Sequence, residues 1–143
     1  MAFQTSVAVG NAQLDAFETA IGASAVVKIF TGAEPVNCAA ADPAGLLVTI
    51  QCPVDWMSPA AARSKALLGT WSGTPTAAGN AASFRLYASD GTTCGAQGSV
   101  TASGGSGDMT TTVNSGSGPV PSVAFTVGAV VTVDAFTLGG SNA

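Results

Sequence analysis

The chain has 143 residues, which suits one domain with a single thin core. Only 8 % of the residues are charged, the formal net charge is −4, and there is no histidine. This composition excludes a basic nucleic-acid-binding patch and any catalytic triad with an imidazole base. Ala, Gly, Ser and Thr make up about half of the chain, and so neutral a surface favours contact with other subunits over free solvation.

Residues 1–10 are predicted to form an N-terminal arm or strand that precedes a single β-sandwich domain over residues 11–143. Phe3, Thr5, Val7 and Val9 fall on one parity, the alternation that is typical of an extended segment. Such a segment can add a strand to the sheet of a neighbouring chain or pair within its own sheet. Both alternatives are open, and the four residues are candidate partner contacts.

Residues 11–21 are predicted to form a short helix. Asn11 suits the N-cap, because its side-chain oxygen can accept a hydrogen bond from a free backbone N–H. Leu14, Phe17 and Ile21 then form one apolar stripe. Gly22 is suited to the left-handed conformation that commonly ends a helix. A helix this short is marginal alone, so we expect it to pack on the rest of the domain.

After this helix the sequence predicts strands separated by turns. A short helical turn is possible over residues 60–62, and Asp90-Gly91 predicts a type I′ hairpin turn. A change of apolar parity around Asp134-Ala135 indicates a β-bulge in the last strand. The expected strands cover residues 25–31, 46–50, 66–71, 82–88, 97–102, 109–114, 123–127 and 129–138.

These elements predict an all-β fold, a jelly-roll-like antiparallel β-sandwich of about eight strands with one short N-terminal helix. No pattern typical of a catalytic site accompanies them. The glycine-rich residues 104–107 lack the lysine of a phosphate-binding loop and are expected to be a flexible connection. Carboxylates such as Asp90 and Asp108 are scattered as solvated charges usually are. We therefore expect no enzyme activity, no cofactor and no metal.

Three cysteines, Cys38, Cys52 and Cys94, are an odd number, which does not fit a disulfide framework. Reduced, partly buried thiols are the expected state, because the N-terminus lacks the features of a secretory signal peptide. A bond between Cys38 and Cys52 is the pairing that the sequence leaves open.

Trp56 and Met57 complete the set of candidate partner contacts. They lie between Pro53 and Pro59 in a stretch that resembles a loop. Tryptophan is common both in cores and in interface hot spots, so Trp56 is interpreted either as a lid over the core or as a contact with a partner. Trp71, at the end of a predicted strand, is expected to pack in the core.

Several strings, taken together and in this order, resemble the capsid cement (decoration) proteins of short-tailed bacteriophages, and the resemblance spans most of the chain. They are NAQLD (11–15), IGAS (21–24), KIFTGA (28–33), YASDGTTC (87–94) and GDMT (107–110).

The resemblance implies a structural virion protein with no catalytic residues. Such a protein binds the outer surface of an icosahedral capsid and cements neighbouring subunits of a separate major capsid protein. It implies a homodimer or another symmetric assembly, made in the host cytoplasm and located on the virion, with no nucleic-acid or membrane partner. The alternatives are a phage tail or fibre component, or a carbohydrate-binding module that uses Trp56 and Tyr87.

Overall fold

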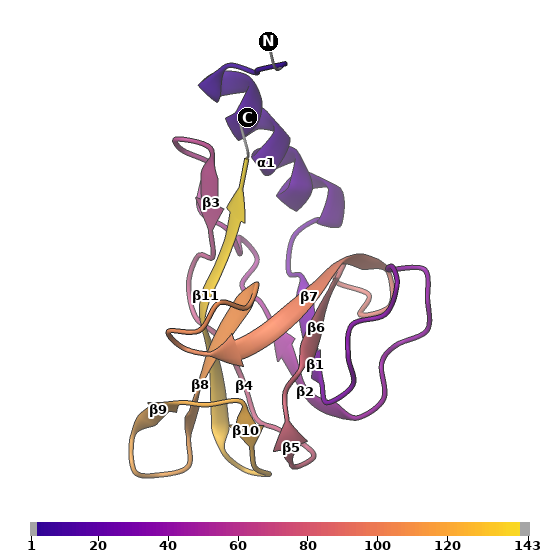
Figure 1. Ribbon diagram of the computed structural model, residues 1–143, viewed down its shortest axis with the longest axis vertical. Helices are drawn as coiled ribbons and strands as arrows, with labels where there is room; N and C mark the ends of the chain where they lie inside the picture. Colours follow the sequence, from indigo (N-terminus) through magenta and orange to yellow (C-terminus); the bar gives the residue numbers. More distant parts are fainter. Residues whose placement is uncertain (1–2, 141–143) are drawn as a thin grey trace.

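The N-terminal helix α1 (Val7–Ile21) lies at one end of the molecule and the strands follow it (Figure 1). The computed structural model describes residues 3–140. Within this range eleven strands follow the helix: β1 (Val26–Phe30), β2 (Leu46–Gln51), β3 (Ser64–Ala66), β4 (Trp71–Gly73), β5 (Gly79–Asn80), β6 (Ser83–Tyr87), β7 (Cys94–Ala102), β8 (Met109–Asn114), β9 (Pro119–Pro121), β10 (Ala124–Phe125) and β11 (Val130–Gly139).

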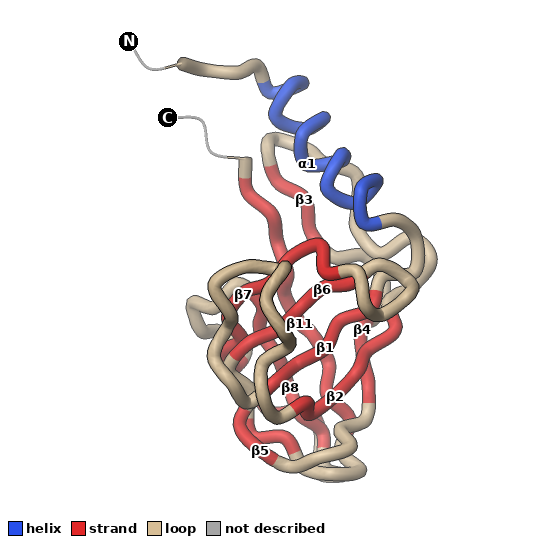
Figure 2. Tube along the Cα trace, turned by 90° about the vertical axis from the view of Figure 1, so that its right-hand side faces the viewer, coloured by secondary structure: helices blue, strands red, loops and turns tan. Residues whose placement is uncertain are grey.

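The main sheet runs in the order β2-β1-β6-β7-β8-β11-β3 and folds over on itself. In Figure 1, β1, β2 and β6 lie on the right and β8 and β11 on the left. In Figure 2, turned by 90°, the first group lies in front of the second. Strand β4 also pairs with β11, β9 pairs with β8, and β5 pairs with β10 in a separate small ladder. The prediction of an all-β sandwich with one short N-terminal helix is confirmed.

Apolar side chains fill the space between the two layers. On β1, Val27 and Ile29 are fully buried, and on β11, Val131 and Val133 are nearly so. Strand periodicity explains this, because alternate residues point to the same face of a sheet. A chain of ring contacts links α1 to both layers: Phe17, Trp56, Trp71, Phe136 and Phe84, with successive centroids 5.6–6.2 Å apart.

The helix begins earlier than predicted. Ser6 is the N-cap, and its hydroxyl accepts a hydrogen bond from the amide of Val9 at 3.2 Å. The prediction of an extended arm or strand over residues 1–10 is therefore wrong from Val7 onward, and Asn11 is not a cap. The helix ends as predicted, before Gly22, which has a φ of 92°. Residues 1–2 and 141–143 of the predicted ranges lie outside the described residues.

The predicted third strand over residues 66–71 is wrong. Instead β3 and β4 flank a connection that contains Gly69, whose φ of 73° is a conformation that glycine adopts without strain. Both short strands pair with β11, which is long enough for both. Strand β4 pairs near the start of β11, and β3 pairs near the end of β11. The predicted helical turn at 60–62 is instead the tip of a hairpin, where Ala62 and Arg63 have φ values of 48° and 62°.

The glycine-rich connection between β7 and β8 is tightly packed, which corrects the expectation of a flexible segment. Strands β7 and β8 pair in parallel although few residues separate them. A Cβ atom on Gly105 or Gly107 would lie 2.6 or 2.9 Å from the hydroxyl oxygen of Thr101, so the turn needs glycine at both positions. The carboxylate of Asp108 accepts hydrogen bonds from the amide and hydroxyl of Ser99, at 2.9 and 2.8 Å.

Two local predictions about the β-hairpins and bulges have different outcomes. The register between β11 and β8 shifts between Val133 and Ala135, which confirms the bulge. Asp90-Gly91 does form the turn between β6 and β7, but the turn is not type I′, because only Gly91 has a positive φ there. The carboxylate of Asp90 instead accepts hydrogen bonds from the amides of Thr92 and Thr93, both at 2.8 Å.

Candidate functional site

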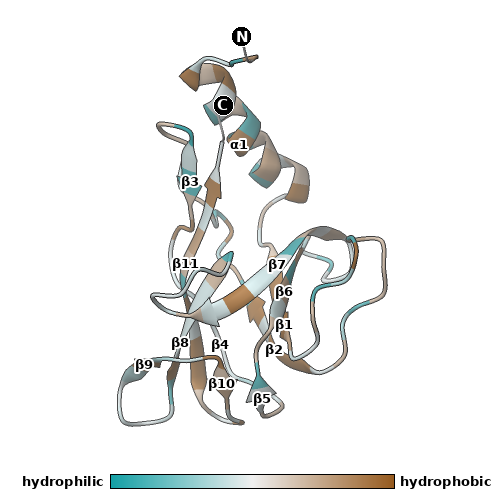
Figure 3. Ribbon diagram, in the orientation of Figure 1, coloured by the Kyte–Doolittle hydropathy of each residue, from teal (hydrophilic) through white to brown (hydrophobic). Residues whose placement is uncertain are grey.

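The outward side of α1 is the most distinctive surface of the molecule. We call it the outer face of α1 and define it by five exposed residues: Val9, Ala12, Gln13, Ala16 and Ala20. None of them is charged. Figure 3 shows brown and pale segments along most of this helix, and Figure 1 shows that it stands beyond the end of the sandwich. An apolar helix face turned to solvent is unusual, since surface helices normally turn polar residues outward.

Four of the predicted contact residues lie before or in the first turn of α1, and one of them, Val9, belongs to the outer face. The side chain of Phe3 is 88 % exposed, and those of Val7 and Val9 are about half exposed. Thr5 is half-buried, and its hydroxyl accepts a hydrogen bond from the guanidinium of Arg63 at 2.8 Å. Phe3, Val7 and Val9 are therefore accessible as expected, whereas Thr5 holds the N-terminal segment against the hairpin tip.

Trp56 and Met57 are not available to a partner in this fold, which corrects their assignment as surface contacts. Their exposed fractions are 0 % and 1 %. Trp56 packs edge-on or tilted between Phe17 and Trp71, and its indole nitrogen donates a hydrogen bond to the carbonyl of Gly22 at 2.8 Å. It is thus the lid over the core, and α1 covers it. The amide of Met57 donates to the Glu18 carboxylate at 3.1 Å.

Both acidic residues of α1 point inward, to a buried lysine. Lys65 on β3 is 2 % exposed, and its ammonium nitrogen lies 2.8 Å from the Asp15 carboxylate and 2.9 Å from that of Glu18. It also donates to the carbonyl of Ser58 at 3.0 Å. Burial disfavours the charged form of Lys65, but the hydrogen bonds to both carboxylates outweigh it and raise the pKa of the ammonium group. Lys65 therefore stays protonated and cannot act as a base or nucleophile near neutral pH.

The Asp15 carboxylate is held in its ionised form by the same arrangement. The hydrogen bond from Lys65 is the largest influence, followed by the bond from the amide of Ala60 at 3.0 Å, and together they lower the pKa of Asp15. The two acids lie three residues apart, which places them on one side of the helix. The face of α1 that a soluble helix would normally expose is therefore turned toward the domain.

An open cleft of about 250 Å³ lies beside these groups. Its lining is Asp15, Glu18, Thr19, Asp55, Met57, Pro59 and Lys65. Lys65 already neutralises part of the acidic charge, and within residues 3–140 no group of three or more His, Cys, Asp or Glu side chains is arranged to hold a metal ion. An Asp15 carboxylate of lowered pKa held against a protonated lysine matches no general acid–base pair. The cleft is thus part of the helix anchor.

A hairpin tip fixes the first turn of α1. Backbone at positive φ is strained for Ala62 and Arg63, because neither is glycine. The amide of Arg63 donates to the side-chain oxygen of Asn11 at 2.9 Å, and its guanidinium donates to the carbonyl of Ser6 at 3.0 Å. Gly10 is the only buried residue of the helix, and a Cβ there would lie 2.8 Å from a guanidinium nitrogen of Arg63. These contacts orient α1 relative to the sheet.

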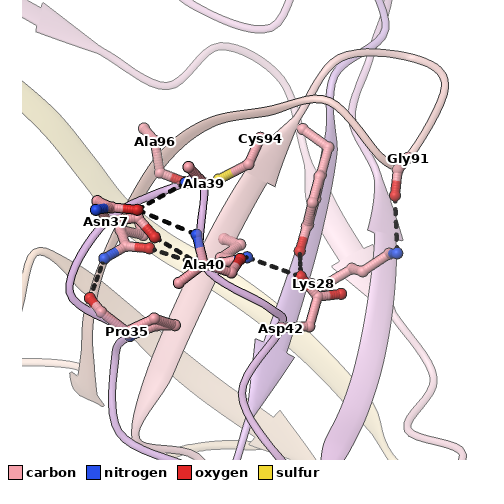
Figure 4. A network of polar contacts seen from close by, with 12 residues as sticks. Lys28, Pro35, Asn37, Ala39, Ala40, Asp42, Gly91, Cys94 and Ala96 are labelled. Carbon is pink, nitrogen blue, oxygen red and sulfur yellow. Dashed lines mark hydrogen bonds and ion pairs between the residues drawn. The ribbon is translucent and has the colours of Figure 1, made fainter.

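A second polar network holds residues 32–45 on the outer side of the sheet (Figure 4). Arg85, 2 % exposed, forms a 2.9 Å ion pair with Asp42 and donates to the carbonyls of Asn37 and Ala40, both at 2.9 Å. The Tyr87 hydroxyl donates to the same carboxylate and is the largest cause of the lowered pKa of Asp42. Burial and this bond raise the pKa of Tyr87. The buried Nε of Arg85 has no hydrogen-bond partner within residues 3–140, but the two terminal nitrogens of its guanidinium are both paired, so the network anchors the loop.

Comparisons with known proteins give no relative for this chain: no protein family, no curated protein and no solved structure matches it. No helix in residues 3–140 is both long and apolar enough to cross a membrane.

Sequence reasoning missed the anchoring residues Asp15, Glu18, Arg63 and Lys65. The spacing of the two acids was visible, but it reads equally well as a solvated helix face. The one signal in the sequence is the scarcity of basic residues, four in 143, which makes each of them a candidate for an ion pair. Two of the four, Lys65 and Arg85, are indeed buried in ion pairs.

Proposed function

We propose that this chain is a structural protein of the capsid-cement type. In this role it binds the outer surface of an icosahedral phage capsid and holds neighbouring subunits of a separate major capsid protein together, as a dimer or another symmetric assembly. The work is done by free energy of binding alone, with no cofactor and no reaction. Its site of action is the virion.

The outer face of α1 carries this proposal. An uncharged helix face that projects beyond the sandwich, with both acids turned inward, is suited to being covered by another subunit. Phe3 and Val7 are further exposed apolar side chains near the start of the helix, although at 3.6 residues per turn Val7 lies on the opposite side of α1 from the outer face. Each copy offers a modest area, and repeated engagement on a fixed lattice of sites makes the sum of many weak contacts large.

The carbohydrate-binding alternative receives no support, because it needs aromatic side chains on the surface. Trp56 is 0 % exposed and Tyr87 is 1 % exposed. A tail or fibre component would use the same helix face, so the location of the chain on the particle separates that alternative from the cement role.

The test measures binding to shells assembled from the major capsid protein that is encoded in the same genome. Shells and chain are mixed, sedimented and quantified, and labelled chain is located on intact particles by electron microscopy. We expect saturable binding over the whole shell. Absence of binding to the shell, or label confined to the tail, would contradict the cement role.

A matched pair of variants tests the helix face separately. Ala16→Glu places a charge on the outer face of α1, whereas Val127→Glu places the same charge between β10 and β11, where the side chain is 65 % exposed. Burying an unpaired carboxylate in an interface costs several kcal/mol, so we expect Ala16→Glu to weaken shell binding at least about 10-fold and Val127→Glu less than about 2-fold. Equal binding of the two variants would show that the shell contacts another surface.

A further inference from the structure

The segment from Pro35 to Asp42 is held flat against strands β6 and β7. Arg85 reaches the carbonyls of Asn37 and Ala40, and the side-chain amide of Gln97 donates to the carbonyl of Pro35. The side-chain oxygen of Asn37 also accepts from the amides of Ala39 and Ala40, at 2.9 and 3.0 Å. Cys38 lies between two residues fixed in this way.

The sheet register places Cys94 beneath that segment. Arg85 faces Gln97 across the ladder and Tyr87 faces Cys94, with a register shift between Leu86 and Tyr87. Directly opposed residues share a face of the sheet, so Cys94 lies on the side that Arg85 and Tyr87 present to the loop. Figure 4 shows the Cys94 sulfur directed toward the loop at Ala39, the residue that follows Cys38.

The Cys94 thiol donates a hydrogen bond to the carbonyl of Ala96 at 3.5 Å, and Cys38 is among the groups that influence its ionisation. Burial first, and then the hydrogen bond with the Cys38 thiol, raise the pKa of Cys94 to about 12. Both residues are free thiols and both are partly exposed, so a small reagent in solution can reach them.

Cys52 is placed differently, which decides between the possible pairings. Its side chain is 4 % exposed and belongs to the core cluster between the two layers. The loop that carries Cys38 lies on the opposite, outer side of the same sheet. A bond between Cys38 and Cys52 would therefore have to pass through the sheet, and the pairing that the sequence left open does not fit the fold.

We propose that Cys38 and Cys94 form a redox-modification site, a dithiol that small-molecule disulfides such as oxidised glutathione convert into an intramolecular disulfide. One thiolate attacks a sulfur of the glutathione disulfide, forms a mixed disulfide and releases one glutathione thiolate. The second protein thiolate then attacks the protein sulfur of the mixed disulfide and releases the second glutathione. Two protein thiols are oxidised, one glutathione disulfide is reduced to two glutathiones, and both thiol protons go to solvent or to the departing thiolates.

The bond ties the segment 35–42 covalently to β7 and closes a long loop, from Cys38 to Cys94. Crosslinks that close long loops restrict the unfolded chain most. A reducing cytosol keeps the pair open, and an oxidising solution closes it. Because a pKa of about 12 leaves little Cys94 thiolate near neutral pH, closure is slow there and accelerates as the pH rises. This inference does not depend on the cement function.

The experiment treats the folded chain with oxidised glutathione and maps the product by mass spectrometry. Cleavage after lysine and arginine, combined with cleavage before aspartate, separates the three cysteines, since Asp42 lies between Cys38 and Cys52 and Asp90 precedes Cys94. We expect a monomer lighter by two hydrogens, with Cys38 joined to Cys94. Its melting temperature should exceed that of the reduced chain by at least about 5 °C.

Three single variants provide the controls. Cys38→Ser and Cys94→Ser should abolish both the intramolecular bond and the rise in melting temperature. Cys52→Ala should retain both, even if its own stability is lower. A Cys38–Cys52 bond, a crosslinked dimer, or a product that remains a mixed disulfide with glutathione at equilibrium would each overturn the proposal.

Discussion

Replacing Lys65 by methionine should release α1 from the sandwich. Methionine keeps most of the length and volume of the lysine side chain, so little cavity is created and the change removes chiefly the charge. The variant loses the ion pairs to Asp15 and Glu18 and the bond to the carbonyl of Ser58. Both carboxylates are then left without their only basic partner among the described residues.

The magnitude follows from the burial of the groups left behind. Removing one member of a buried ion pair costs about 3–5 kcal/mol. The side chain of Asp15 is 49 % exposed and regains water, whereas that of Glu18 is only 20 % exposed and remains poorly solvated. We therefore expect a loss at the lower end, about 3 kcal/mol of the free energy of unfolding. With a urea slope of about 2 kcal/mol per molar, the midpoint should fall by about 1.5 M.

The assay is equilibrium unfolding in urea, followed by the fluorescence of Trp56 and Trp71, which are both fully buried. Hydrogen exchange supplies a local measurement, and the amides of α1 should lose protection before those of the sheet. A 15-residue helix is marginal when it is detached, so undocking should melt it.

Lys28→Met is the matched control, because it removes the same charge from a half-buried lysine. The ammonium group of Lys28 donates to the carbonyl of Gly91 at 2.8 Å and lies 4.7 Å from the centre of the Tyr87 ring, and it forms no ion pair within residues 3–140. We expect a loss of about 1 kcal/mol. If Lys65→Met were no more destabilising than Lys28→Met, apolar packing alone would hold the helix and the reasoning about the buried charges would be refuted.

Two further predictions concern the turns. Ala62→Gly should raise the free energy of unfolding by about 1 kcal/mol, because glycine adopts the positive φ of 48° without strain. Thermal unfolding measures the change, and a loss of stability would show that the hairpin tip is unstrained. For Asp90, the bonds from the Thr93 hydroxyl and from the amides of Thr93 and Thr92 lower the pKa to about 2, against about 3.9 when unfolded. Its contribution to stability is thus full above about pH 4 and is lost as the pH falls toward 2. Wild type should lose stability between pH 4 and 2 more steeply than Asp90→Asn, and parallel profiles would contradict this assignment.

Strand positions could be predicted where alternation and β-branched residues agree. The segments around β1, β2, β6 and β8 were placed to within one or two residues, because each buries alternate side chains in the core. The bulge near Asp134 can also be predicted from alternation, because the apolar residues change from odd to even positions there. The short strands β5 and β9 left no comparable signal, since an element of two or three residues has no measurable period.

The start of α1 was misjudged because local propensity and tertiary contacts disagree. Val7 and Val9 favour strands, yet Ser6 caps a helix there and Arg63 fixes its first turn. The same contact occupies the side chain of Asn11, which the sequence alone suggested as the cap. Local sequence cannot show that a hairpin more than forty residues away will supply these bonds.

Trp56 and Met57 were misplaced for a related reason. Their neighbours Pro53 and Pro59 suggest an exposed loop, and the loop is real, since neither tryptophan nor methionine lies in a long strand. Phe17 of α1 packs against the indole ring of Trp56 and helps to shield it from solvent. A residue in irregular structure can therefore be part of the core when a distant element packs over it, and only the three-dimensional fold reveals that element.

The position of α1 has a consequence for the order in which the chain folds. The helix α1 is synthesised before every strand. The strands beside which it lies include β3, which pairs with the C-terminal end of β11, and β11 is the last strand to be made. Leu14 reaches that end, near Gly140. The packing of Leu14 therefore cannot be completed until β11 has been made, whereas Phe17 packs on Trp56, which is made earlier. Contacts so distant in sequence slow folding, so the last contacts of the first element depend on the last strand.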